Sequence, residues 1–332
     1  MRLTWSRWFA AGSIAIALAA GAATRPHYGG TLRVEMREAY ERREEMAQPA
    51  GFVLATWEAG RRAVFTADES AASGRPYLDA IEIQMGRPLR DQSTDLELGK
   101  TDVVELGPNE LRRQIAGRKV WSSSPVRLMA LVFGPRVEDA RVREALALAV
   151  DRGAIHSVLL QRQGEISGAL LPQWLSGDAF LFAPAFDVAR ARSLVTTLAA
   201  PARTISLAVS DASLKPIADR IALNARDAGL VVPVTAQSGI ADVRLVEVRV
   251  VSTDPARALA ETAAELGLAE PAHADTPEGL YNAERTLLDG FRVIPLFQLP
   301  RVFGASARVR GAPGITPLGE WHFENLWVED RP

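Results

Sequence analysis

The sequence predicts a mixed α/β protein about two domains long. First, its 332 residues are roughly twice the length of an average domain. Second, short apolar stretches separated by glycine- and serine-rich turns follow residue 52, a pattern typical of strands. Third, amphipathic helices alternate with strand-like segments after residue 139, which favours parallel strand pairing. A hydrophobic content of 48% with 23% charged residues is enough to build a packed core.

The first part of the chain is expected to form strands and loops of a mixed sheet. Residues 29–36, GGTLRVEM, alternate apolar and polar side chains after a glycine pair. The polar run 37–49 is interpreted as a solvated connection, with a short charged helix as the alternative. The apolar stretches FVLATW, RAVFTA, YLDAIEIQM and TDVVEL then indicate strands, and two more apolar segments flank Pro125.

The segment DARVREALALAVDRGAI, residues 139–155, predicts a helix with one apolar face. Apolar residues recur from Val142 to Val150 at the spacing of a helix face, and Asp139 suits the N-cap position. The charged residues of the segment lie mostly off that face. Because an apolar face at this spacing is usually buried, we expect this helix to support the fold and to carry no ligand.

The rest of the chain alternates between segments with the apolar spacing of a helix and short apolar segments typical of strands. In order, we expect a helix at 188–200, a strand at 205–210, a helix at 216–230, the strands VVPVTA and VRLVEVRVV, a helix near 280–288 and a strand at 291–297. This order indicates an α/β lobe with parallel pairing.

Composition and motifs exclude several function classes. Because 38 basic residues stand against 40 acidic ones, we expect no nucleic-acid partner. The chain has no cysteine, hence no disulfide, thiolate metal site or thiol nucleophile. The four histidines are scattered, no G-x-S-x-G elbow occurs, and GKT at 99–101 has Thr94 where a phosphate-binding loop needs glycine. We therefore expect no enzyme, no cofactor and no metal site.

The N-terminus has the features of an export signal. Arg2 and Arg7 precede an uncharged apolar run from Trp8 to Ala20, and small residues follow at 20–22. A retained membrane anchor is the alternative, but the run is shorter than the roughly 20 apolar residues of a spanning helix. We interpret residues 1–23 as a signal peptide and expect a periplasmic protein.

Several segments together resemble the extracytoplasmic solute-binding proteins of ABC importers, specifically the oligopeptide, dipeptide and nickel type. The similar segments, in chain order, are YGGTLRVEM (28–36), GFVLATWEAGRRAVF (51–65), GRPYLDAIEIQM (74–85), LELGKTDVVEL (96–106), FGPRVEDARVREALALAVDRGAI (133–155) and IPLFQLPRVFGASARVRG (294–311). The segment at 133–155 is similar to the most specific marker of that family, in which the helix is a structural support.

The resemblance implies a two-lobed periplasmic-binding-protein-like α/β fold with mixed sheets and a cleft between the lobes. Residues 24–125 and 292–332 would form the first lobe and residues 126–291 the second, with crossing strands near 120–133 and 292–303. It also implies a function: a monomer that captures a small molecule, peptide-like or other, and delivers it to an ABC permease at the inner membrane.

Two departures from the family pattern concern the ligand. A large subdomain of the family is missing, because only residues 35–50 separate the first strand from the next matching segment. Val251 aligns with the aspartate that pairs with a peptide's amino terminus, and Val248 replaces a tryptophan. Because a buried ammonium needs a counter-charge, Val251 argues against a free peptide amino terminus. The alternative hypothesis is a degenerate homologue with a structural or partner-binding role and no ligand.

Six residues are the candidates for ligand contact. The aromatic ones lie on a loop with proline and glycine, where they either form a ligand platform or pack the loop onto the lobe. The polar ones either face the cleft or serve as a turn residue and surface charges. The candidates are Trp174, Phe180, Phe182, Asp254, Gln298 and Arg301.

The signal-peptide interpretation makes a direct prediction. The exported protein is expected to begin at Ala23 or Thr24, because small residues precede both positions. N-terminal sequencing of the periplasmic fraction measures this. Recovery of a chain that begins at Met1 from the cytoplasm would contradict the assignment.

Overall fold

The computed structural model describes residues 25–329, except 210, 237–240 and 273–274. The predicted signal peptide therefore lies outside the described residues. Within the described part, no helix combines the length and the apolar character that crossing a membrane requires.

The described residues form a mixed α/β structure, as predicted. The strands are β1 (Thr31–Glu35), β2 (Phe52–Glu58), β3 (Arg62–Ala67), β4 (Ala80–Gln84), β5 (Val103–Glu105), β6 (Lys119–Phe133), β7 (Glu165–Ile166), β8 (Leu207–Val209), β9 (Val234–Thr235), β10 (Val243–Arg249), β11 (Val293–Ala305), β12 (Val309–Arg310), β13 (Gly314–Ile315), β14 (Trp321–His322) and β15 (Trp327–Val328). The helices are α1 (Leu89–Glu97), α2 (Pro108–Arg112), α3 (Ala140–Ala149), α4 (Arg152–Ala154), α5 (Gln173–Ser176), α6 (Val188–Thr196), α7 (Lys215–Asp227), α8 (Pro255–Leu266) and α9 (Pro277–Leu288).

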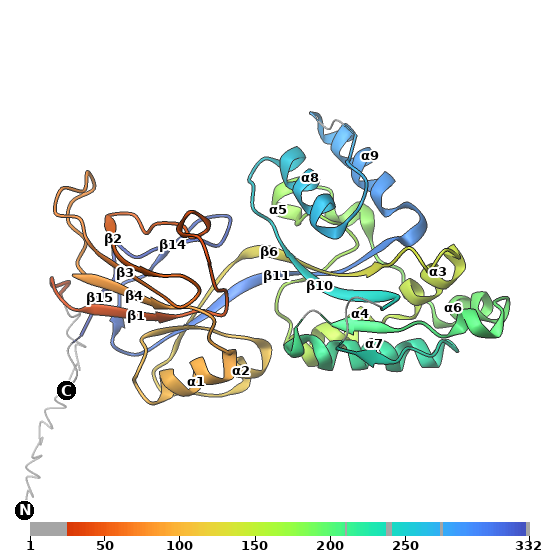
Figure 1. Ribbon diagram of the computed structural model, residues 1–332, viewed down its shortest axis with the longest axis horizontal. Helices are drawn as coiled ribbons and strands as arrows, with labels where there is room; N and C mark the ends of the chain where they lie inside the picture. The colour runs from red at the N-terminus through yellow and green to blue at the C-terminus, as the bar shows by residue number, and fades with distance from the viewer. Residues whose placement is uncertain (1–24, 210, 237–240, 273–274, 330–332) are drawn as a thin grey trace, which may run out of the picture.

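One sheet runs through the whole molecule. Its order is β2-β3-β4-β1-β5-β11-β6-β10-β8-β9, and β7 pairs with β11 off this path. Parallel pairs (β1 with β4 and β5, β8 with β9 and β10) and antiparallel pairs occur together, so the sheet is mixed. Figure 1 shows two lobes side by side, joined by the long antiparallel strands β6 and β11.

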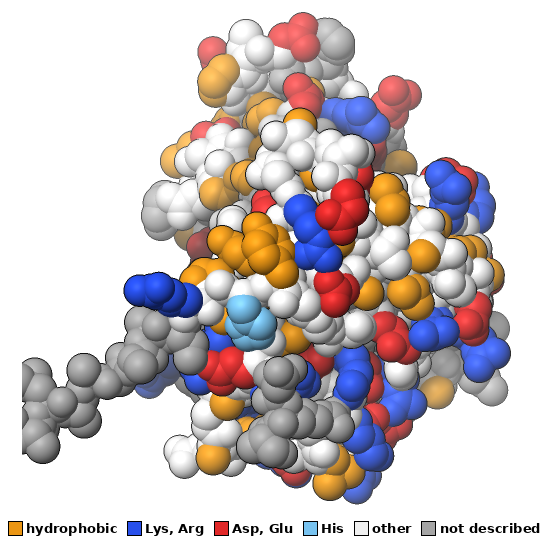
Figure 2. All heavy atoms as spheres, turned by 90° about the vertical axis from the view of Figure 1, so that its left-hand side faces the viewer, with side chains coloured by type: hydrophobic (Ala, Val, Ile, Leu, Met, Phe, Trp, Pro, Cys, Tyr) orange, Lys and Arg blue, Asp and Glu red, His pale blue; other side chains and the backbone are white. Residues whose placement is uncertain are grey.

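Two long strands, β6 and β11, lie where the family resemblance implied crossing strands. Each runs from one lobe into the other, so the division of the chain at residues 126 and 292 falls within β6 and just before β11. That division stays a prediction. Figure 2 views the molecule from the first-lobe end, where acidic and basic side chains are interspersed.

The second lobe is buried on both faces of its sheet. Met129 and Leu131 of β6 pack into a cluster with α3 and α7, whereas Leu128 and Ala130 pack into another with α8 and α9. In Figure 1 these helix pairs lie on opposite sides of the crossing strands. Because successive strand residues point to opposite faces, a strand covered on both sides needs the unbroken apolar run that β6 has.

The first lobe has a core of its own. Strand residues such as Leu32, Phe52 and Ile81 form its centre. Phe323 and Val328, near the end of the described residues, pack into the same cluster. The described chain therefore returns from the second lobe to the first on β11 and ends there.

The helix predicted within 139–155 begins where expected. Asp139 caps α3 by accepting a hydrogen bond from the Arg141 amide at 2.9 Å, and Leu146 is completely buried. Two arginines of the same segment, Arg143 and Arg152, are buried as well, which the sequence pattern did not indicate. Both guanidinium groups donate to backbone carbonyl groups. The Arg152 guanidinium donates to the carbonyl group of Pro295 on β11.

A buried carboxyl group makes the stability of the second lobe depend on pH. Glu284 of α9 is fully buried and accepts hydrogen bonds from the backbone amides of Leu170 and Leu171. Burial raises the pKa of Glu284 to about 7, against the lowering effect of these amides. The folded protein therefore holds this proton more tightly than the unfolded chain, in which the pKa is about 4.3.

Stability is expected to fall as the pH rises from about 4.3 to about 7 and then to level off, with a total loss of about 4 kcal/mol from this group. Glu284→Gln should remove this part of the pH dependence while it keeps an acceptor oxygen for the amides. Urea unfolding at about pH 5 and about pH 8 measures it. Glu278→Gln, an exposed change on the same helix, is the control, and equal pH dependence in both variants would contradict the assignment.

Candidate functional site

A network of charged side chains lies where the two lobes meet. It begins in residues 36–50, the segment that links β1 to β2. The Arg37 amide donates to Oε2 of Glu105 at 2.6 Å, which fixes the segment to β5. The Arg37 guanidinium reaches the other lobe, at 3.2 Å from Glu247 Oε2 on β10 and 3.6 Å from Asp211 Oδ2. One side chain of the first lobe thus contacts two carboxylates of the second.

The contacts of Arg37 are partly buried, which strengthens them. Glu247 also lies 3.4 Å from Arg127 on β6, and the side chains of Glu247 and Arg127 are less than one fifth exposed. Burial works to lower the pKa of Arg37, but Glu247, Asp211 and Glu105 together raise it above its usual value. Arg37 therefore stays charged, in a setting where solvent screens the pairs less than at the surface.

A second part of the network surrounds Arg301 on β11. Arg301 is 4% exposed and donates to Glu105 Oε1 at 2.8 Å. Glu38 lies 3.9 Å from Arg301 and 3.8 Å from Arg249, so it faces both guanidinium groups. Tyr40 donates its hydroxyl to Glu38 at 2.5 Å. Burial and the adjacent Glu38 raise the pKa of Tyr40 to about 12.

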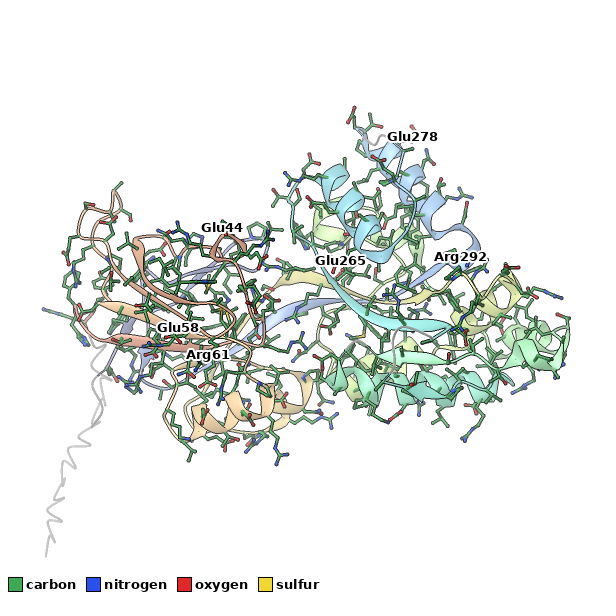
Figure 3. The ribbon with its side chains drawn as sticks, in the orientation of Figure 1. Glu44, Glu58, Arg61, Glu265, Glu278 and Arg292 are labelled. Atoms are coloured by element: carbon green, nitrogen blue, oxygen red, sulfur yellow. The ribbon has the colours of Figure 1, made fainter. Side chains whose placement is uncertain are left out.

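The network differs from the charged residues labelled in Figure 3. In Figure 3 the labelled Glu44, Glu58 and Arg61 belong to the first lobe, and Glu265 and Glu278 to the second. Glu44, Arg61, Glu265 and Glu278 are exposed, as is usual for surface charges, and Glu58 is half-buried. The network is instead concentrated at the junction of the lobes and joins them.

A cleft of about 550 Å³ opens between the lobes beside this network. The first lobe contributes residues 86–90 and 105–110, and the second contributes residues 159–163 and 211–217. Eight charged residues belong to its lining: Arg37, Arg87, Arg90, Glu105, Glu110, Arg127, Asp211 and Glu247. Its size lies within the roughly 300–1,000 Å³ of sites that bind small molecules.

A smaller cavity of about 160 Å³ lies in the first lobe. Apolar side chains form most of its wall and residues 45–50 border it; two arginines from the crossing region reach it. Its lining residues are Val34, Met36, Tyr40, Glu45, Met46, Ala47, Gln48, Pro49, Ala50, Ile83, Val103, Arg249, Arg301, Phe303, Glu320, Trp321, His322 and Phe323.

The structure does not bring the six candidate residues together. Arg301 lines the smaller cavity. Gln298 is buried, and its Nε2 donates to the carbonyl groups of residues 169 and 170 at 3.2 and 3.0 Å. Asp254 caps α8 by accepting from the Arg257 amide at 2.8 Å. The hydrogen bonds of Gln298 and Asp254 stabilise the fold. A ligand role for any of these three residues stays a prediction.

The aromatic candidates lie around α5. Trp174 is 37% exposed, and its Nε1 donates to the Pro125 carbonyl on β6 at 2.6 Å, so it fastens α5 to a crossing strand. Phe182 packs against Tyr281 of α9, with ring centres 5.0 Å apart. The side chain of Phe180 lies outside the described part of the structure. Neither Trp174 nor Phe182 lines the cleft or the smaller cavity.

Sequence reasoning missed the residues of the network. The interpretation of residues 37–49 as a solvated connection was wrong at its start, because Arg37 and Tyr40 are partly buried. A usable signal was the charge inside apolar strands, as in Glu105 of TDVVEL and Glu247 of VRLVEVRVV. A charge in such a position needs a partner. In the described part of the chain, histidines and carboxylates form no group of three that could hold a metal ion.

Comparisons with known proteins agree with this architecture. Residues 30–277 match a family model described as bacterial extracellular solute-binding proteins, family 5 Middle. A comparison with curated protein sequences gives no match.

Solved structures share the fold at low sequence identity. A dipeptide-binding protein from Pseudoalteromonas, in complex with Met-Leu, has a TM-score of 0.68 at 15% identity over 84% of this chain and 64% of its own. NikA from Staphylococcus aureus, in complex with Ni(L-His)2, has a TM-score of 0.67 at 15% identity, over 84% of this chain and 68% of its own. The oligopeptide-binding protein AppA from Bacillus subtilis, in complex with a nonapeptide, has a TM-score of 0.63 at 13% identity, over 84% of this chain and 66% of its own. The chain thus spans about two thirds of the length of these proteins.

The network makes a prediction about lobe separation. Arg37→Gln removes both contacts to the second lobe and is expected to cost about 1 kcal/mol of lobe association. The chain has no cysteine, so labels at Ser73→Cys and Ser193→Cys, exposed positions in different lobes, report the distance between them by energy transfer. We expect a longer mean distance in the variant.

The matched control is Arg42→Gln, which breaks an exposed ion pair with Glu45 inside the first lobe. It should leave the distance between the labels unchanged. Identical distance distributions for Arg37→Gln and the unmodified background would show that the network does not hold the lobes.

Proposed function

Because this chain belongs to the family 5 bacterial extracellular solute-binding proteins, a non-enzymatic family of ABC transport systems, we propose that it captures a small solute between its lobes for import. The solute would be handed to an ABC permease at the inner membrane. The protein would act in the periplasm as a monomer. A ligand that contacts both lobes favours one relative position of the lobes, which a permease can recognise.

The cleft between the lobes is the observation that carries this proposal. Both lobes line its 550 Å³, and Arg37 already links them along one wall. A solute in this space would touch α2 and the end of β5 on one side and α7 on the other. Binding energy could thus be used to change the lobe arrangement.

The charges of the cleft favour a solute other than an unmodified peptide. Val251, aligned with the family's amine-binding aspartate, is 55% exposed. Glu247 and Asp211 face the cleft but are already engaged by arginines. An ammonium group that paired with Glu247 or Asp211 would have to displace Arg37, which would leave that guanidinium without its carboxylates.

One observation favours the second candidate, a homologue with a structural or partner-binding role. The chain spans only 64% of the dipeptide-binding protein to which it is similar, so part of that protein's architecture has no counterpart here. The two candidates differ in one measurable property, which is whether any small solute stabilises the folded chain.

A thermal-shift screen of the exported protein against sugars, amino acids, metals and peptides separates the two candidates. A captured solute at about 100 times its Kd is expected to stabilise the fold by about 2.7 kcal/mol and to raise Tm accordingly. Ala212→Trp, which fills the wall of the cleft at an exposed position, should abolish that shift. A screen in which no class of compound raises Tm would support the partner-binding candidate.

Unmodified di- to pentapeptides are expected to bind with a Kd above about 1 mM, because Val251 replaces the family's amine-binding aspartate and three carboxylates of the cleft, Glu105, Asp211 and Glu247, are already paired with arginines. Calorimetry with a mixed peptide library measures this. Saturable heat that disappears when the peptides are N-acetylated would contradict the expectation, and Glu247→Gln would then identify the pairing residue.

A further inference from the structure

A hydrogen bond outside the charged network also joins the two lobes, at the edge of the cleft. Arg112, the last residue of α2 in the first lobe, donates from its guanidinium to the backbone carbonyl of Val158 in the second lobe. In Figure 1, α2 lies on the same side of the crossing strands as α7. Arg112 is exposed, so this contact lies at the rim of the cleft and not in its buried wall.

The contacts between the lobes match the two parts of the second-lobe wall. Residues 159–163 follow Val158 directly, and residues 211–217 begin with Asp211, which lies 3.6 Å from Arg37. On the other side of the cleft, residues 105–110 of the first lobe lead into Arg112. Each part of the second-lobe wall is therefore bonded to the first lobe at one end, and widening of the cleft at either part has to break the contact there.

The Val158 carbonyl can accept from Arg112 because it lies at the end of a helix. Val158 belongs to the helical turn Ile155–Leu159, and the carbonyl groups of a last helical turn lack amide partners within the helix. Gln161 Nε2 donates to the same carbonyl at 2.5 Å. Arginine side chains commonly satisfy carbonyl groups at this end of a helix, so the Arg112 guanidinium is a suitable second donor.

The turn that carries the Val158 carbonyl is fixed to the crossing strand β11. Gln161 and Arg162 have φ angles of 54° and 60°, a left-handed conformation that is uncommon for non-glycine residues and needs support from other contacts. The backbone of Gly164 packs so closely on β11 that an added Cβ would lie 2.2 Å from the Gln298 carbonyl oxygen. The Val158 carbonyl is therefore held in place relative to β11.

The donor is held in the first lobe in a similar way. Arg118 donates to the backbone carbonyl groups of Glu110 and Leu111, at 3.1 and 3.3 Å, which fastens the end of α2. Because donor and acceptor are each fixed to their own lobe, the bond between Arg112 and Val158 depends on the relative position of the lobes. A movement of the lobes that separates the two atoms beyond about 3.5 Å breaks it.

We propose that Arg112 is a latch that holds the cleft closed, and that it must release the Val158 carbonyl before a solute can enter or leave. Release frees the side of the cleft formed by residues 159–163, while Arg37 still holds the side that begins at Asp211. The cleft then opens at one edge, without separation of the crossing strands. The part of the latch in solute exchange rests on the function proposed above, but the latch itself can be measured without a solute.

Energy transfer between labels on Ser73→Cys and Ser193→Cys measures the latch. Arg112→Ala removes the guanidinium and should increase the population of molecules at the longer label distance at least about fivefold, because a hydrogen bond from a charged donor is lost. The matched control is Arg113→Ala, which removes a neighbouring arginine that pairs with Glu97 inside the first lobe at 2.8 Å. It should leave the label distances unchanged.

Access to the cleft is tested with a single cysteine. Leu89→Cys places a thiol on the first-lobe wall, at a half-buried position, in a chain that has no other cysteine. Arg112→Ala should speed the reaction of this thiol with a maleimide at least about fivefold, because the cleft is open more often. Equal acceleration by Arg113→Ala would show that loosening of the first lobe exposes the thiol, and would overturn the latch.

Arg112→Lys distinguishes the loss of the donor from other effects of the substitution. Lysine keeps a charged donor on a long side chain, so it should restore part of the short-distance population and part of the protection of the thiol. Unchanged label distances and unchanged thiol reactivity in Arg112→Ala would also overturn the latch. None of these measurements uses a solute, so a failure of the latch and a failure of solute capture are observed separately.

Discussion

The antiparallel pairing of β6 with β11 is the interaction on which both lobes depend. The ladder covers β11 from Val293 to Ala305 and so runs from the core of the second lobe to that of the first. β10 extends the sheet from β6 in the second lobe, and β5 extends it from β11 in the first. The register shifts around Pro295 and Pro300, where proline cannot donate to the ladder. Irregular pairing of this kind bends a strand pair and increases its twist.

The same strand pair holds a buried positive charge at the junction of the lobes, and this charge requires carboxylate partners close to it. Arg301 lies on β11, and removing it from water is offset only if its partners are fixed. Glu105 is held on β5, and Glu38 is held by the Tyr40 hydroxyl. Burial works to raise the pKa of Glu38, but Arg301, Tyr40 and Arg249 together hold it below its ordinary value. The junction therefore contains a set of mutually compensated charges.

Sequence patterns predicted what depends on local periodicity and missed what depends on distant contacts. The helix that begins after Asp139 and its cap were readable, because apolar spacing and capping act within a few residues, whereas the crossing strands were implied by the family resemblance. The burial of Arg152 was not, since its partner is the Pro295 carbonyl on another strand. Arg37 and Glu247 lie 210 residues apart in sequence, so neither position indicates the other. Of the candidate site residues, only Arg301 lines a described cavity, because aromatic residues on a loop look alike whether they face a ligand or pack on a strand.

The short segment between β1 and β2 explains how a chain that spans about two thirds of its structural relatives still forms a complete junction. Within about fifteen residues it supplies Arg37 to the second lobe, Glu38 to the two arginines and residues 46–50 to the wall of the smaller cavity. A segment this short cannot enclose the volume that a whole subdomain would, since each residue spans at most about 3.5 Å. It can only cover the sheet closely. The segment therefore leaves only a cavity of about 160 Å³ against the first lobe, and its Glu38 pairs with the arginines of the junction.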